Sequence, residues 1–126
     1  NKKEPLHFRK LRVDDLSDTI DSEFDTHVKV VYTDHGEEHS FEAVGNGPID
    51  AVRRGLAEQL GVNIKVLDYE EHALQSGSNS QAAAYIHLLD GETGHVTYGV
   101  GVSSNITRAS IRAIFSAMNR LGLGGR

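Results

Sequence analysis

The chain has 126 residues, 38% of them hydrophobic and 25% charged, and a formal net charge of −5 at pH 7. This length suits one domain with a real core, and the acidic balance argues against a nucleic-acid partner. The absence of cysteine excludes disulfides, Cys-ligated zinc and thiol catalysis. No apolar run approaches the ~18 residues that cross a bilayer and no signal peptide is visible, so we expect a cytoplasmic protein without a membrane partner. Because the sequence begins at Asn1 and not at Met, we expect a piece of a larger protein.

The first half of the sequence predicts three strands and a helix. Alternating hydrophobic residues mark the strands, and helical spacing of apolar residues marks the helix. The expected elements are strands at 6–13, 24–33 and 39–44, a loop at 16–23, a hairpin turn at 34–37 and a helix at 49–60. Val28, Val30 and Tyr32 should share one face of the second strand, and Gly61 should end the helix as its C-terminal cap.

The second half predicts the same order again. The expected elements are strands at 62–74, 82–89 and 95–102, loops at 75–80 and 90–94, a helix that begins after an N-cap at 103–105, and a tail at 122–126. Gly99 and Gly101 fall on one face of the last strand, where another segment must approach closely.

This repetition predicts an α+β fold of two βββα units related by a pseudo-twofold axis, with helices packed on antiparallel sheets. The units span about 6–61 and 62–122 of a single domain covering 1–126. Superposing the helix starts pairs Asn46 with Asn105, Val52 with Ile111 and Leu56 with Phe115. The two helix N-termini would then face a shared crevice.

The turn Gly45-Asn46-Gly47-Pro48 joins the third strand to the first helix. Its glycines let the backbone bend sharply, and proline suits the first position of a helix. Asp50, in the first turn, complements the positive end of the helix dipole. Free N–H groups at such a start suit a small carboxylate or phosphate. On spacing alone, a plain strand-to-helix corner is an equal alternative.

Two patterns could be taken for enzyme sites. HGEEH at 35–39 matches the H-x-x-E-H motif of one zinc-peptidase class, which needs both histidines on one face of a helix. The flanking alternation places His35 and His39 on a hairpin tip instead. Asp68, Glu70 and His72 would share one face of a strand, and a solvated or interface face is a plainer interpretation of them than an acid–base site.

Other enzyme signals are missing from the sequence. There is no Gly-x-Ser-x-Gly nucleophile elbow and no phosphate-binding Gly-x-x-x-x-Gly-Lys loop. The dinucleotide fingerprint lacks its third glycine, because Asp50 stands in that place, and the strands form hairpins where that fold needs parallel units.

Four segments together carry a resemblance to a known family. They are GNGPIDA at 45–51, VLDYEEHA at 66–73, QAAAY at 81–85 and GVGVSSNITRAS at 99–110. In this order they resemble the C-terminal regulatory domain of 2-isopropylmalate synthase, over roughly residues 24–121. The resemblance implies an allosteric homodimeric domain that binds L-leucine and feedback-inhibits the condensation of acetyl-CoA with 2-oxoisovalerate. It also implies a catalytic TIM barrel with a divalent metal elsewhere in the parent chain, so we expect no catalysis and no cofactor in this part.

The resemblance further implies a set of leucine-binding residues. They are Asn46, Gly47, Pro48, Ile49, Asp50, Val66, Tyr69, Ala73, Ser80, Ala82 and Ile106. The glycine-rich turn would face the amino-acid backbone of leucine, and the strand residues would line its side-chain pocket. Ser80 stands where the family pattern has an apolar or small residue. Three alternatives stay open: an isoleucine-sensing regulatory domain of a citramalate synthase, a ligand-free dimerisation module, and a small metallohydrolase using His35 and His39.

Overall fold

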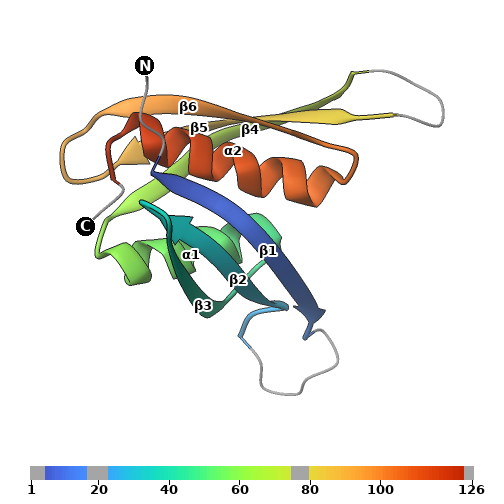
Figure 1. Cartoon of the computed structure of the whole chain (residues 1–126), viewed down its shortest axis with the longest axis horizontal. Coiled ribbons are helices and arrows are strands. Elements are labelled where there is room, and N and C mark those ends of the chain that lie inside the picture. Colours follow the sequence, from blue (N-terminus) through green and yellow to red (C-terminus); the bar gives the residue numbers. More distant parts are fainter. Residues whose placement is uncertain (1–4, 17–22, 75–79, 124–126) are drawn as a thin grey trace.

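The computed structural model describes residues 5–16, 23–74 and 80–123 (Figure 1). Its elements are β1 (Leu6–Asp15), β2 (Thr26–Asp34), β3 (Glu37–Gly45), α1 (Pro48–Leu60), β4 (Ile64–Ala73), β5 (Ala82–Asp90), β6 (Val96–Ser103) and α2 (Ile106–Arg120). Each predicted strand and helix is present, with ends that differ by one or two residues. The predicted loops at 16–23 and 75–80 and the tail at 122–126 lie mostly outside the described residues.

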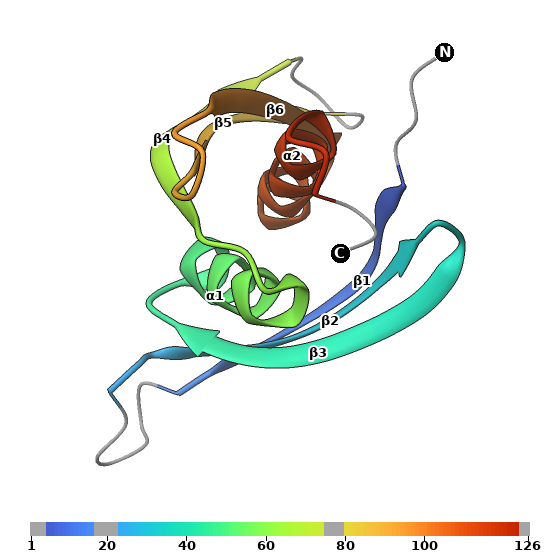
Figure 2. The ribbon, with the colours of Figure 1, turned by 90° about the vertical axis from the view of Figure 1, so that its left-hand side faces the viewer.

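The six strands form two antiparallel three-stranded sheets, ordered β1-β2-β3 and β4-β5-β6. Both helices lie between the sheets, as the end-on view in Figure 2 shows. Helix α1 packs on β2 and β3 and also reaches β4, whereas α2 packs on β5 and β6 and also reaches β1. The predicted α+β fold of two βββα units is therefore confirmed. Within the described residues, no helix is long and apolar enough to span a membrane.

The core forms where the inward faces of the sheets meet the helices. Val28, Val30 and Tyr32 are buried on one face of β2, as the alternation predicted. Gly99 and Gly101 face α2, and a Cβ on either glycine would collide with the backbone of that helix. The predicted close approach is thus confirmed, and its partner is α2, which lies almost directly on the β6 backbone.

The β2–β3 hairpin has a two-residue turn. His35 and Gly36 have φ angles of 53° and 84°, the left-handed pair that a tight primed hairpin turn requires. His35 therefore lies in the turn, and His39 lies on β3 with its ring 5.5 Å from that of Tyr32. The H-x-x-E-H pattern is not helical, as the alternation around it predicted.

The register of the repeat differs from the prediction by one residue. Gly47 is the N-cap of α1 and Asn105 is the N-cap of α2, and their carbonyls accept from Ala51 and Ala109 at equivalent places. The predicted pairing of Asn46 with Asn105 is wrong because the two helices use different residue types as caps. The matching asparagines suggested a superposition that the backbone does not follow.

Candidate functional site

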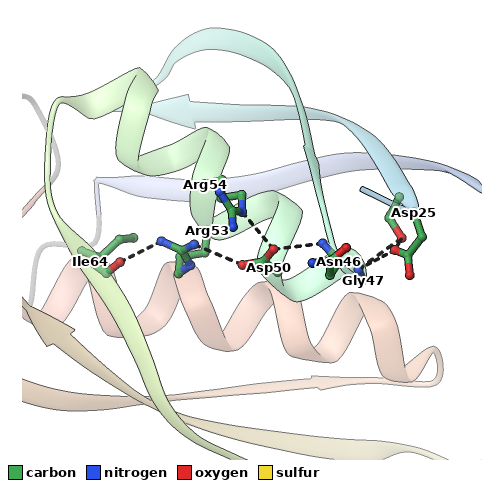
Figure 3. Close-up of polar contacts among 8 residues, drawn as sticks. Asp25, Asn46, Gly47, Asp50, Arg53, Arg54 and Ile64 are labelled. Atoms are coloured by element: carbon green, nitrogen blue, oxygen red, sulfur yellow. Dashed lines mark hydrogen bonds and ion pairs between the residues drawn. The ribbon is translucent and has the colours of Figure 1, made fainter. Parts of the chain in front are cut away.

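The turn before α1 is fixed to the start of β2. The N–H of Gly47 donates to Asp25 Oδ1 at 3.0 Å and to Thr26 Oγ1 at 3.2 Å (Figure 3). Gly47 itself has φ 96° and ψ 162°, a conformation open to glycine and strained for other residues. The glycine is therefore required for the shape of the turn, and two neighbouring side chains hold that shape.

The first turn of α1 has no side-chain cap within the described residues. Pro48 opens the helix and has no N–H, so the uncapped amides are those of Ile49 and Asp50. Uncapped amides at a helix start carry the positive end of the dipole. This end of α1 can therefore receive a carboxylate from outside the helix.

The Asp50 carboxylate accepts three hydrogen bonds beside the N-terminus of α1. It accepts from the N–H of Asn46 at 2.9 Å, from Arg53 Nη2 at 3.1 Å and from Arg54 Nε at 2.9 Å (Figure 3). Burial alone would raise the pKa of Asp50, but the Asn46 N–H and the two guanidinium groups outweigh it and hold that pKa below its ordinary value. Arg53 also donates to the carbonyl of Ile64 at 3.1 Å and so connects α1 to the beginning of β4.

A pocket of about 530 Å³ opens between α1 and β4. Its lining residues are Asn46, Ile49, Asp50, Arg53, Lys65 and Val66. The structure thus brings together four of the predicted residues and adds two cations that sequence reasoning missed. Arg53 was detectable in principle, because it lies three residues after Asp50 on the same helix face. The two cations and one carboxylate give this wall a net positive charge.

A β-bulge determines which β4 side chains face inward. The register shifts between Val66 and Asp68, so Val66 and Tyr69 pair with Leu88 and Ile86, two inward-facing residues of β5. Without the bulge, residues three apart would point to opposite faces. Ala73 pairs with Ala82 and lies on the same face farther along the hairpin.

Tyr69 links β4 to the start of α2. Its hydroxyl lies 2.8 Å from Ser110 Oγ and donates to Glu71 at 2.7 Å, and Ser110 in turn donates to the carbonyl of Ile106. Burial raises the pKa of Tyr69, the Ser110 hydrogen bond lowers it and Glu71 raises it further, so the net shift is upward. Two predicted site residues, Tyr69 and Ile106, are therefore joined through Ser110, which the sequence did not single out.

The remaining predicted leucine-binding residues lie outside the pocket between α1 and β4. Gly47 shapes the turn, and Pro48 faces a second crevice of about 290 Å³ at the start of α2. Ala73 and Ser80 are exposed and Ala82 is half-buried at the far end of the β4–β5 hairpin. These three do not line the larger pocket, and their part in a ligand site stays a prediction.

The residues of the two alternative sites make contacts on exposed faces and turns. Asp68, Glu70 and His72 lie on the outward face of β4, where His72 is 3.3 Å from Glu70. His35 pairs with Asp34 at 2.7 Å in the hairpin turn. Across residues 5–16, 23–74 and 80–123, no three His, Asp or Glu side chains gather as a metal site would require.

Comparison with known proteins agrees with this architecture. Residues 1–122 match the family described as the LeuA allosteric (dimerisation) domain. The chain is 52% identical over 85 residues to a 2-isopropylmalate synthase of Parafrankia sp., covering 68% of this chain and 14% of the relative. It is 45% identical over 112 residues to the Kineococcus radiotolerans 2-isopropylmalate synthase, covering 89% of this chain and 18% of the relative. The Clostridium acetobutylicum enzyme is 34% identical over 116 residues, which cover 92% of this chain and 20% of the relative. The chain therefore belongs to the LeuA allosteric (dimerisation) domain family.

Proposed function

We propose that this chain is the regulatory domain of a 2-isopropylmalate synthase, and that it binds L-leucine as a feedback inhibitor. The observation that carries the proposal is the uncapped start of α1, which opens beside a pocket with both cationic and anionic groups. An α-amino acid carries a carboxylate and an ammonium group close together, so a site of mixed charge suits it. The relatives named 2-isopropylmalate synthase supply the biosynthetic context.

Each part of leucine has a partner in this arrangement. The uncapped amides of Ile49 and Asp50, with Arg53 beside them, suit the carboxylate. The ammonium suits the Asp50 carboxylate, which accepts three hydrogen bonds and can accept about one more. Val66 lines the pocket from the inward face of β4 and suits the isobutyl group, with Tyr69 farther along the same face. Burial of that group contributes ~1.5–3 kcal/mol.

Such a ligand would lie across the boundary between the two βββα units, because α1 belongs to the first and β4 to the second. Leucine inhibits only if it binds one arrangement of the units more tightly than another. In the parent enzyme, this preference would pass to a catalytic TIM barrel that holds the divalent metal and condenses acetyl-CoA with 2-oxoisovalerate. The present chain would form the homodimeric, non-catalytic part of that enzyme.

A thermal-shift panel of leucine, isoleucine and valine tests the ligand. A ligand that binds only the native state raises its stability, by about 2.7 kcal/mol at a hundredfold excess over Kd. We expect the largest rise in Tm with leucine. A rise with isoleucine alone would instead identify an isoleucine sensor of the citramalate synthase type. No rise with any of the three would leave a ligand-free dimerisation module.

A further inference from the structure

The outward faces of the two sheets can be compared position by position. Lys29 and Glu42 form the central outward pair of the first sheet, and Tyr85 and Val100 form the same pair in the second. The flanking inward-facing residues are Val28 and Val30 in one central strand and Ala84 and Ile86 in the other. The same structural position therefore carries charge on one face and apolar surface on the other.

The outward face of the first sheet is suited to water. His27 lies 2.9 Å from Glu42 and 3.3 Å from Asp14, which forms a row of polar contacts across all three strands. The outward side chains of this face are mostly polar, namely Lys10, Arg12, Asp14, His27, Lys29, Glu38, Ser40 and Glu42, with Val31 and Val44 interspersed among them. Exposed groups of this kind need no protein partner.

On the outward face of the second sheet, apolar side chains are exposed along β6 and at Tyr85 of β5. Tyr98 is 48% exposed, Val96 53%, Tyr85 39% and Val102 37%. The strand register makes them neighbours, since Tyr85 pairs with Val100 on β6, between Tyr98 and Val102. A contiguous exposed patch of aromatic and β-branched side chains marks an interaction surface.

Charge is distributed unevenly across this face. Asp68 and Glu70 lie on its β4 edge, with Lys65 near the start of that strand, whereas Arg112 and Arg120 of α2 reach its β6 edge. Arg120 reaches that edge from α2 and places its guanidinium carbon 4.8 Å from the centre of the Tyr98 ring. Arg112 donates to the carbonyl of Val102 on the same strand at 2.7 Å.

The acidic and basic ends lie in one row across the strands. Asp68 pairs with His87, His87 pairs with Tyr98, and Arg120 stacks on Tyr98. A twofold axis parallel to β5 would reverse this row, so that Arg120 of one copy lies over Asp68 of the other. A hollow of about 200 Å³ with acidic and aromatic walls lies at that end, and such walls suit a cationic side chain.

We propose that the outward face of β4-β5-β6 pairs with the same face of a second copy of this chain. A surface with an apolar centre and opposite charges at its edges is complementary to itself under a twofold axis, which is what an isologous dimer requires. Two sheets packed face to face in this way resemble the two halves of a β-sandwich. The inference rests on the homodimer in the proposed function and specifies the surface that forms it.

Sedimentation velocity over a concentration series tests this surface with Tyr98→Asp and a matched control. The control is Ser40→Asp, which adds the same charge at the equivalent place on the first sheet, where the side chain is also exposed. We expect a dimer for the unchanged chain and for Ser40→Asp, and a dissociation constant raised about a hundredfold or more for Tyr98→Asp. Unchanged circular dichroism in Tyr98→Asp excludes unfolding as the cause.

A charge swap provides a second readout that does not depend on Tyr98. Asp68→Arg and Arg120→Asp should each weaken the dimer, and the double variant should regain most of the lost affinity. A dimer that tolerates both Tyr98→Asp and the single charge reversals would overturn the surface and leave the homodimer standing. A chain that is monomeric at every concentration, yet stabilised by leucine, would overturn both the surface and the homodimer while leaving the ligand proposal intact.

Discussion

The two helix starts occupy equivalent places in the fold, but their chemistry differs. At α2, the side chain of Asn105 accepts from the N–H of Arg108 at 2.9 Å, so the protein caps its own helix. At α1, the cap residue is Gly47, which has no side chain, and no other described side chain replaces it. The α2 start is therefore completed by its own side chain, whereas the α1 start has no side-chain cap among the described residues.

The crevices in front of the two helix starts differ in volume and in their charged lining residues. The crevice at α1 has a volume of about 530 Å³ and contains Asp50, Arg53 and Lys65. The one at α2 has about 290 Å³, and among its described lining residues Arg108 is the single ionisable one. A zwitterion therefore finds both partner charges at α1 and one at α2. The repeat supplies two similar frameworks, and the side chains give only the α1 crevice the mixed charge that the proposed leucine site requires.

Substitution of Gly47 by Asp should have the largest effect on leucine binding at the α1 start. The aspartate would have to adopt a backbone φ near 96°, and its side chain would bring a second carboxylate next to Asp50. We expect leucine affinity to fall by roughly a hundredfold or more, equivalent to about 2.7 kcal/mol, while the domain still folds. Calorimetric titration and a melting curve measure the two effects separately.

Gly36→Asp is the matched control for that variant. Gly36 also has a positive φ, 84°, and open space where a Cβ would lie, but it lies in the β2–β3 turn. It should lose a similar amount of stability and bind leucine normally. Normal leucine binding by Gly47→Asp would show that the turn before α1 is merely structural.

Removal of the Arg53 guanidinium should weaken leucine binding at the α1 start, but less severely than Gly47→Asp. Arg53→Met keeps much of the apolar stem but loses the contacts to Asp50 and Ile64 and one cation of the pocket. We expect the leucine Kd to rise about tenfold, or ~1.4 kcal/mol. Arg54→Met is the control, since Arg54 also binds Asp50 but does not line the pocket. Equal losses in the two variants would argue that only the orientation of Asp50 matters.

Loss of the side-chain cap at α2 should lower the stability of the domain without changing its affinity for leucine. Asn105→Ala removes the side-chain cap of α2 and should cost about 1 kcal/mol of unfolding free energy. Chemical denaturation measures that loss, and leucine titration of the same variant should give the wild-type affinity. A large loss of leucine affinity would mean that the start of α2 takes part in the site.

The smallest expected effect is the pH dependence of Asp50. Because its folded-state pKa is lowered, the stability it contributes is present above the unfolded pKa of about 4 and is lost as the pH falls through the folded pKa. Asp50→Asn should therefore be less stable than the unchanged chain at pH 7, by less than about 1 kcal/mol, and the difference should vanish in acid. Denaturation series at several pH values measure it. A difference that stays constant with pH would contradict the role of the carboxylate charge.

Most of the fold was predictable because local patterns determine it. Alternation located β2, the turn at His35 and Gly36 joined it to β3, and Gly61 ended α1 with a left-handed φ of 67°. The glycines of β6 even predicted a close neighbour, although not that α2 would be that neighbour. These features depend on residues near one another in sequence, and so they are readable without tertiary information.

The details of the site depend on longer-range geometry. The bulge after Val66 brings that residue and Tyr69 to one face, and the strand pattern does not show where a bulge falls. Lys65 joins the pocket only because α1 and β4 meet there. The apolar side chains of β6 point outward, because Gly99 and Gly101 on the opposite face are the residues that meet the helix.

Calorimetric titration of the chain with L-leucine is the decisive test of the proposed leucine site. We expect saturable binding of leucine, tighter than that of isoleucine or valine. This binding should be strongly weakened in Gly47→Asp and retained in Gly36→Asp and Asn105→Ala. The absence of any leucine heat from a folded chain, at temperatures chosen so that the binding enthalpy does not vanish, would contradict the proposed site.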